Sequence, residues 1–324
     1  MIDTGSGVLI ATICNTIREA SRYALWVSDG TRQYVVDLSG YILGPGGLTG
    51  IAYRDKRLYV AVQAAETRVL VLDLALNVVG SIVDDRFREL HSLHVAGDAL
   101  FMASPANGLV LRHDFGTGDT DVVADFGRPS WVAGVHVTAD DVWICAHNLS
   151  FIDAAAQGGG VYSVRRGQTV LDGLGKPHTL MEYRGGFLVL DSVNSGVVIF
   201  DLAGTRHVIR LEGWLRGAAV TEEGRLLVAG GPHRLVSRKN PADVVEQGLR
   251  DTATNRLQVF ELDDETLTRT YLPEMPGFEI YDLLILPAGI DLTPDEDRIV
   301  KVERGMFARL YYAALMKGLA RGNG

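Results

Sequence analysis

The chain has 324 residues, 47% hydrophobic and 22% charged, a composition typical of a globular protein with a sizeable core. A formal net charge of −9 disfavours a nucleic-acid partner and an anionic membrane surface. No apolar run approaches the ~20 residues of a membrane span, and the first residues lack the basic start and long apolar stretch of a signal peptide.

The N-terminal segment contains three short strand-like runs, GVLIATICN, ALWVSDG and QYVVDLS, bounded by polar turns. The first run contains Cys14, and Cys145 lies in a similar run, DVWICA. We expect two buried thiols rather than a disulfide or a metal site, as is typical of a protein in the reducing cytoplasm.

From Leu48 onward one pattern recurs: a small or polar residue, a short apolar strand, a polar turn, and two further strands. Thr49 aligns with His91 and Leu58 with Leu100, both at a spacing of 42 residues. Five copies are present, and they begin at Leu48, Leu90, Trp131, Lys176 and Leu215. A period of about 40–45 residues with several strands per unit predicts an all-β propeller.

The two ends of this region are incomplete copies of the same unit. The run FEIYDLLILP (278–287) resembles a first strand with no second strand behind it, whereas GVLIATICN resembles a second strand with nothing before it. Pairing them completes a sixth blade and leaves no open edge. We therefore predict a six-bladed β-propeller over residues 1–289, closed by N- and C-terminal strands; a two-domain sandwich is the alternative.

Two segments depart from the strand pattern. Residues 233–255 interrupt the fifth copy, and Asn240-Pro241 predicts the start of a short helix there. Thr293-Pro294 opens a tail, residues 290–324, with apolar residues at helical spacing. We expect a C-terminal helix that packs on the propeller or on a second copy as a homo-oligomer contact, with a membrane-surface helix as the alternative.

The starts of the inner strands should meet at the mouth of the central channel. Ordinary packing favours small or apolar residues at such positions, yet most of these are polar. The series is Thr49, His91, Ala133, His178, Arg216 and Tyr281-Asp282. This set predicts a site for a small-molecule substrate or ligand.

Several readings of this set stay open. His91, His178 and Asp282 are ligand types for one divalent metal ion. A histidine could instead be a general base, with Arg216 holding an anionic group and Tyr281 supplying a proton. The set could also bind a ligand without chemistry, or simply satisfy its own hydrogen bonds across the channel.

Further contacts with a substrate are expected from residues near this mouth: Thr49, Trp131, His136, His233 and Arg234. His136 lies three residues into its strand, where a core histidine is the alternative. His233 and Arg234 open the insertion and reach a ligand only if that segment covers the channel.

The segments KPHTLMEYRGGFLVLDSVNSGVVIFD, LEGWLRGAAVTEEGRLLVAGGPHR and FEIYDLLILPAG, in this order, resemble the uncharacterised bacterial family called domain of unknown function 4915. The resemblance extends to about Gly289 and rests on Pro177-His178, Arg216-Gly217 and Tyr281-Asp282. It implies a propeller and assigns no catalytic residue. We predict an enzyme that acts on a small anionic or sugar-like substrate by hydrolysis, elimination or isomerisation; a non-catalytic binding or scaffold propeller is the alternative.

Overall fold

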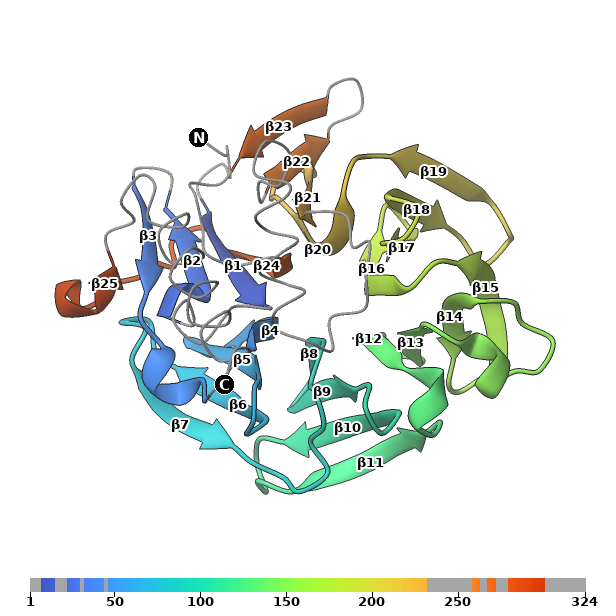
Figure 1. Ribbon diagram of the computed structural model, residues 1–324, viewed down its shortest axis with the longest axis horizontal. Helices are drawn as coiled ribbons and strands as arrows, with labels where there is room; N and C mark the ends of the chain where they lie inside the picture. The colour runs from blue at the N-terminus through green and yellow to red at the C-terminus, as the bar shows by residue number, and fades with distance from the viewer. Residues whose placement is uncertain are drawn as a thin grey trace, which may run out of the picture.

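The computed structural model shows a six-bladed, all-β propeller, as predicted (Figure 1). It describes residues 7–14, 22–29, 32–43, 46–231, 258–262, 267–271 and 279–300. The predicted helices of the insertion and of the C-terminal tail, with most of their residues, lie outside these ranges. No helix in the described ranges is long and apolar enough to span a membrane.

Five blades are four-stranded antiparallel sheets whose strands follow one another in sequence. Blade 1 contains β4 (Gly47–Arg54), β5 (Arg57–Gln63), β6 (Arg68–Leu72) and β7 (Val78–Ile82). Blade 2 contains β8 (Leu93–Ala96), β9 (Ala99–Ser104), β10 (Leu109–Asp114) and β11 (Thr120–Asp125). Blade 3 contains β12 (Val132–Val137), β13 (Val142–Ala146), β14 (Gly159–Ser163) and β15 (Gln168–Leu174).

Blade 4 contains β16 (Pro177–Tyr183), β17 (Gly186–Asp191), β18 (Gly196–Phe200) and β19 (Arg206–Arg210). Blade 5 contains β20 (Trp214–Val220), β21 (Leu226–Gly231), β22 (Gln258–Leu262) and β23 (Leu267–Tyr271). Four 3₁₀ turns accompany the strands: η2 (Ser39–Tyr41), η3 (Arg128–Ser130), η4 (Leu149–Phe151) and η5 (Glu296–Arg298). The inner strands begin close to where the five sequence repeats begin.

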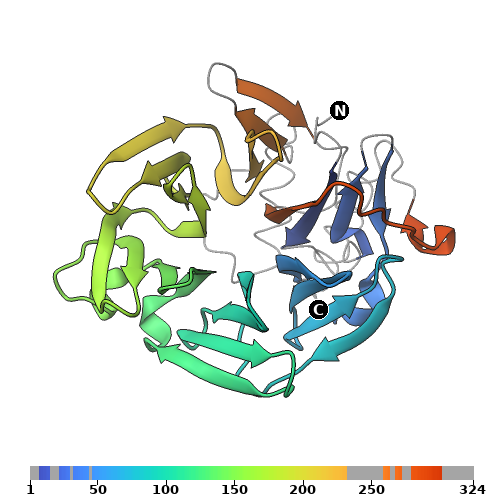
Figure 2. The same cartoon turned by 180° about the vertical axis from the view of Figure 1, so that it is seen from behind.

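Blade 6 combines segments from both ends of the described chain. Its strands run in the order β24 (Glu279–Leu286), β1 (Val8–Cys14), β2 (Leu25–Ser28), β3 (Gln33–Val36) and β25 (Ile299–Val300). β24 pairs antiparallel with β1, and β25 adds a fifth strand on the outer side of β3. Figures 1 and 2 show the red C-terminal segment passing from β24 to the outside of the blue strands.

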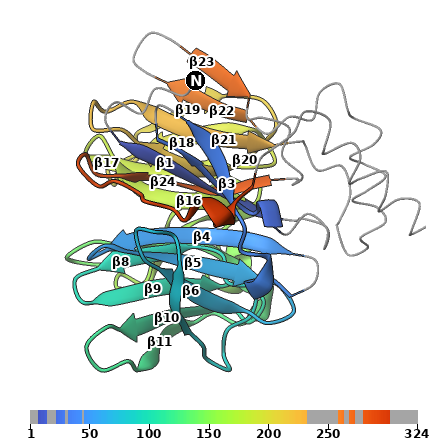
Figure 3. The same cartoon turned by 90° about the vertical axis from the view of Figure 1, so that its left-hand side faces the viewer.

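The apolar core lies between neighbouring blades, where both faces of the second strands are buried. Every residue of β9 and β21 is buried, whereas β11 and β19 at the rim have no buried residue. One cluster joins Val27 of blade 6 with Leu58 and Val60 of blade 1, and similar clusters join the following blades. Seen edge-on, the sheets stack around the axis (Figure 3). Such burial contributes about 1.5–3 kcal/mol per large side chain and holds the inner strands in place.

Around the axis, glycine and larger residues alternate from blade to blade at the points where inner strands approach one another. Gly50, Gly134 and Gly217 lie one residue after the site position in blades 1, 3 and 5. Gly50 and Gly217 face the inner strand of the next blade, whereas a Cβ on Gly134 would stand 2.7 Å from Cys145 Sγ of its own blade. A Cβ on Gly217 would stand 2.7 Å from the Cα of Asp282, and one on Gly50 would stand 2.5 Å from the carbonyl oxygen of His91. The equivalent positions of blades 2, 4 and 6 are Ser92, Thr179 and Asp282. The glycines therefore permit the close contact that brings the site residues together.

Candidate functional site

The residues predicted at the channel mouth come from six blades and lie near the starts of the inner strands, which surround the axis (Figure 1). None of these six residues is more than 5% exposed: Thr49, His91, Ala133, His178, Arg216 and Tyr281. Strand register shifts at this level in blades 1, 3, 4, 5 and 6. Such β-bulges redirect side chains out of the normal alternation, which is how the strands turn these residues toward one another.

Two imidazoles form the centre of the site. The rings of His91 and His178 lie nearly parallel, with centroids 6.2 Å apart and planes at 17°. His91 Nδ1 lies 2.7 Å from the Glu89 carbonyl oxygen, and His178 Nδ1 lies 3.0 Å from that of Lys176. A carbonyl only accepts, so both Nδ1 atoms carry the proton. In the neutral rings Nε2 is then the nitrogen with the lone pair.

The two carbonyls face the rings because of the backbone that precedes each histidine. Glu89 and Lys176 have φ values of 55° and 53°, in the left-handed region that non-glycine residues seldom adopt. Such conformations persist only where surrounding contacts hold them, and they cluster at functional sites.

Ser192 adds a second restraint on His178. It follows β17, and its Oγ lies 2.8 Å from His178 Nδ1 while donating to the Leu215 carbonyl oxygen at 2.5 Å. Because the hydroxyl proton is used on Leu215, Ser192 accepts from Nδ1–H. It therefore orients the imidazole and holds its tautomer, much as a carboxylate does beside a catalytic histidine.

Tyr281 lies edge-on to both histidines. Its ring centroid is 5.1 Å from that of His91 and 6.2 Å from that of His178, with interplanar angles of 82° and 89°. Its hydroxyl is buried and makes no hydrogen bond with any described residue. A buried hydroxyl without a partner costs about 1–3 kcal/mol, so a bound molecule or water is expected beside it.

Arg216 forms a buried ion pair that the sequence did not predict. Its Nε lies 3.2 Å from Glu279 Oε2, and the two side chains are 5% and 1% exposed. The guanidinium also lies over the Tyr281 ring, 4.4 Å from its centroid. The positive charge that was expected to hold an anionic group is thus compensated within the protein.

Asp282 faces the seam between blades 6 and 1. Its carboxylate accepts from the backbone N–H of Ile51 at 3.2 Å and of Leu283 at 3.0 Å. Burial raises the pKa of Asp282 to about 7, although these two hydrogen bonds act in the opposite direction.

The metal site predicted from His91, His178 and Asp282 is not assembled. In the described ranges no three His, Cys, Asp or Glu side chains are placed to hold a metal ion. The physical reason is that the Asp282 carboxylate bonds to the backbone of the neighbouring strand, while the two imidazoles are held by carbonyls around Tyr281.

Thr49 and His136 make contacts of other kinds. The Thr49 hydroxyl donates to the Leu90 carbonyl oxygen at 2.6 Å and so links blades 1 and 2. His136 packs against His94 with ring centroids 4.4 Å apart, and burial lowers the pKa of each imidazole to about 4. Both are neutral at neutral pH and lie apart from the His91–His178 pair. His233 and Arg234 lie outside the described residues.

Trp131 lies at the site beside a histidine that the sequence did not single out as part of it. Its ring stacks with His147, at 6.1 Å and 21°, and meets His91 edge-on at 6.3 Å. His147 in turn lies 4.8 Å from His178. His147 and Ser192 each follow a second strand, and that shared position was the available signal. For Glu279, the signal was an acidic residue inside an apolar strand.

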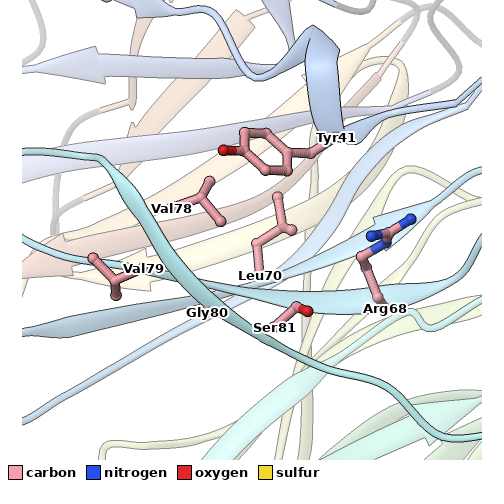
Figure 4. A pocket seen from close by; sticks show the side chains of 7 residues that line it. All are labelled: Tyr41, Arg68, Leu70, Val78, Val79, Gly80 and Ser81. Atoms are coloured by element: carbon pink, nitrogen blue, oxygen red, sulfur yellow. The ribbon is translucent and has the colours of Figure 1, made fainter.

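A pocket on the outer surface lies away from this site. It has a volume of about 300 Å³ and is lined by β6, β7 and η2 of the blade 1 rim, with Tyr41, Leu70 and Val78 around it (Figure 4). Its one charged lining side chain, Arg68, pairs with Glu66, and no histidine, aspartate or glutamate lines it. The polar cluster on the axis is therefore the better candidate.

No protein-family model and no curated protein matches the chain. The resemblance to domain of unknown function 4915 therefore stays a prediction. Among solved structures, a chain of the nidogen/laminin complex superposes with a TM-score of 0.62 at 11% identity, covering 89% of this chain and 100% of that one. Virginiamycin B lyase from Staphylococcus aureus superposes with a TM-score of 0.46 at 11% identity, covering 70% of each chain. A protein of unknown function from Bacteroides thetaiotaomicron superposes with a TM-score of 0.47 at 13% identity, covering 69% of this chain and 59% of that one. At these identities, likeness to the nidogen/laminin chain shows the propeller fold alone.

Proposed function

We propose that this propeller is an acid–base enzyme that acts on a small, polar, uncharged substrate at the axial site. The observation that carries the proposal is the buried Tyr281 hydroxyl, which makes no hydrogen bond with the described residues and lies beside two imidazoles. A substrate oxygen would supply its missing partner.

His178 is the proposed general base. The Lys176 carbonyl and Ser192 hydroxyl hold its proton on Nδ1, so Nε2 can take a proton from the substrate. Tyr281 then donates its hydroxyl proton to the oxygen on which negative charge develops. Elimination, isomerisation and hydrolysis all use such a pair, and the proposal extends to all three reaction types.

The charge of the site favours an uncharged substrate. Glu279 balances Arg216, and neither residue exposes more than 5% of its side chain. A carboxylate or phosphate would have to displace Glu279 from Arg216, which leaves one buried charge without a partner. Breaking a buried pair in this way costs about 3–5 kcal/mol.

The test is a turnover screen of the purified full chain against neutral sugar lactones, glycosides, aldoses and ketoses. For any substrate found, His178→Asn is expected to lower kcat by about 100-fold or more. Ser192→Ala should lower it less, because the Lys176 carbonyl still holds Nδ1–H. His113→Asn, in blade 2 away from the site, is the matched control. Equal turnover by His178→Asn and wild type contradicts the proposal.

A non-catalytic binding or scaffold propeller is the second candidate. It is favoured by the almost complete burial of the site side chains. In that case His178→Asn leaves no turnover to lose and lowers the free energy of unfolding by about 1–3 kcal/mol. A scaffold that oligomerises through its tail should lose its assembly when the chain is cut after Gly289.

The proposal includes closure of the ring by the pairing of β24 with β1. Every other blade is continuous in sequence apart from the insertion in blade 5, so this pair is where the ring is joined. Cys14 and Cys145 are both buried thiols, which supports a reducing compartment.

A further inference from the structure

The backbone at Trp131 is held in an unfavourable conformation. The residue follows η3 and has a φ of 51°, in the left-handed region. The surrounding loop is firmly bonded: His147 N donates to the Trp131 carbonyl oxygen at 3.1 Å, and Asn148 Nδ2 donates to that of Pro129 at 2.7 Å. A bulky side chain seldom adopts this conformation, and it persists here because these hydrogen bonds hold the loop.

This conformation places the indole at one end of a row of aromatic rings. The row runs from Trp131 to His147, stacked at 21°, and from His147 to His178, tilted at 69° with centroids 4.8 Å apart. His91 closes the other side, edge-on to Trp131 at 86°. The proposed base and the indole therefore belong to one row of contacting rings.

Trp131 and His147 are the partly exposed members of this row, whereas His91 and His178 are buried. Of the four tryptophans, Trp26, Trp143 and Trp214 are at most 3% exposed, whereas Trp131 is partly exposed.

We propose that the substrate of this site is a pyranose sugar, and that Trp131 is the platform on which its ring stacks. This rests on the proposed function. One face of a pyranose is a patch of C–H groups that packs on an aromatic ring, while its hydroxyls need donors and acceptors at the edge. Tyr281 offers the donor and His178 the acceptor. An ammonium ligand, which also seeks aromatic rings, is disfavoured because the Arg216 guanidinium already lies 4.4 Å over Tyr281.

The experiment uses the exposure of Trp131. Acrylamide quenching of tryptophan fluorescence is measured with methyl pyranosides of the common hexoses, pentoses and N-acetylhexosamines, and binding to variants is measured by calorimetry. At least one pyranoside should protect the wild type from quenching, whereas sorbitol, choline and adenosine should not. Trp131→Ala should weaken binding about tenfold or more, and Trp131→Phe should retain most of it.

Trp131→Gly is the second truncation, because glycine adopts the left-handed backbone without strain and keeps the loop folded. Trp143→Phe, a buried indole of the same blade, is the matched control and should bind as the wild type does. Protection by no pyranoside, protection by choline or adenosine alone, or full affinity in both truncations overturns the inference. Turnover of a non-pyranose substrate that depends on His178 would overturn it while leaving the proposed acid–base function intact.

Discussion

At the scale of single residues, the site is defined by which groups share protons and charge. Backbone carbonyls set the tautomers of His91 and His178, and Glu279 balances Arg216. Within the site, these choices leave the buried hydroxyl of Tyr281 without a described partner. This arrangement is the basis of the proposed acid–base function on an uncharged substrate.

Glu279→Gln is expected to destabilise the fold strongly. It leaves the Arg216 charge buried without its counterion, which costs about 3–5 kcal/mol. Glu296→Gln is the matched control: its carboxylate pairs with Arg32 but is 75% exposed, so a loss of at most about 1 kcal/mol is expected. Urea unfolding of both variants measures the difference. Equal, small losses would show that the Arg216–Glu279 pair is not a true buried ion pair.

Asp282 should make stability depend on pH. Its folded pKa of about 7 is raised above the ordinary 3.8, so the fold favours the protonated form. The contribution of Asp282 to the free energy of unfolding is therefore greatest below about pH 4, and it falls as the pH rises toward about 7. Between about pH 5 and 8 the wild type should lose roughly 2–3 kcal/mol relative to Asp282→Asn, which cannot ionise. Parallel pH dependences of urea unfolding in the two proteins would contradict the assignment.

The residue types of the site were largely readable from the sequence, but their pairings were not. Polar residues at the starts of inner strands pointed to His91, His178, Arg216 and Tyr281. The Arg216–Glu279 pair and the Ser192–His178 contact depend on distances between blades, which strand patterns do not contain. For the same reason Asp282 was assigned to a metal site, although its carboxylate lies against a neighbouring backbone.

At the scale of the strands, the recurring device is a bulge in the inner strand followed by glycine in every second blade. The bulge turns the site residue toward the axis, and the glycine lets the next inner strand approach. The repeat spacing of about 42 residues predicted these strands and their order. It did not predict the alternation of Gly50, Gly134 and Gly217 with Ser92, Thr179 and Asp282, because that pattern acquires meaning only once the ring is closed.

Gly217→Ala should be poorly tolerated. Its Cβ would stand 2.7–2.9 Å from the Asp282 Cα and carbonyl carbon and the Leu283 nitrogen, all backbone atoms of β24. Since the backbone of a central strand cannot move aside cheaply, a loss of at least about 2 kcal/mol is expected. Gly80 lies in the rim strand β7, where an added Cβ would stand 4.0 Å from its nearest neighbour. Gly80→Ala should therefore change stability by less than about 0.5 kcal/mol. Equal unfolding temperatures of the two variants would refute the close approach of β20 to β24.

At the scale of the molecule, the β24–β1 pair joins segments more than 260 residues apart in sequence. Residues 290–300 strengthen the same blade. Ile290, Leu292 and Ile299 pack on the core shared by blades 6 and 1, and Asp37 N donates to the Arg298 carbonyl oxygen at 3.0 Å. Incomplete repeat units at both ends predicted this pairing, whereas the two-residue strand β25 was too short to have a sequence signature.

Truncations should separate the two contributions. A chain cut after Gly289 keeps β24 and should still unfold in one cooperative transition, at lower denaturant because β25 and its packing are gone. A chain cut after Phe278 loses β24 and should show no cooperative transition, since the inner strand of blade 6 is missing. Cooperative unfolding of the shorter chain would mean that the β24–β1 pair does not close the ring.

The most direct test of the axial site is the tautomer of His178. Long-range ¹H–¹⁵N correlation spectra of protein labelled with ¹⁵N-histidine should show that His91 and His178, among its eight histidines, are protonated on Nδ1. These signals should disappear one at a time in His91→Asn and His178→Asn, and Ser192→Ala should shift only the second. Nε2–H is the commoner form of the free imidazole. Finding His178 protonated on Nε2 would therefore remove the proposed general base and contradict the proposed acid–base function.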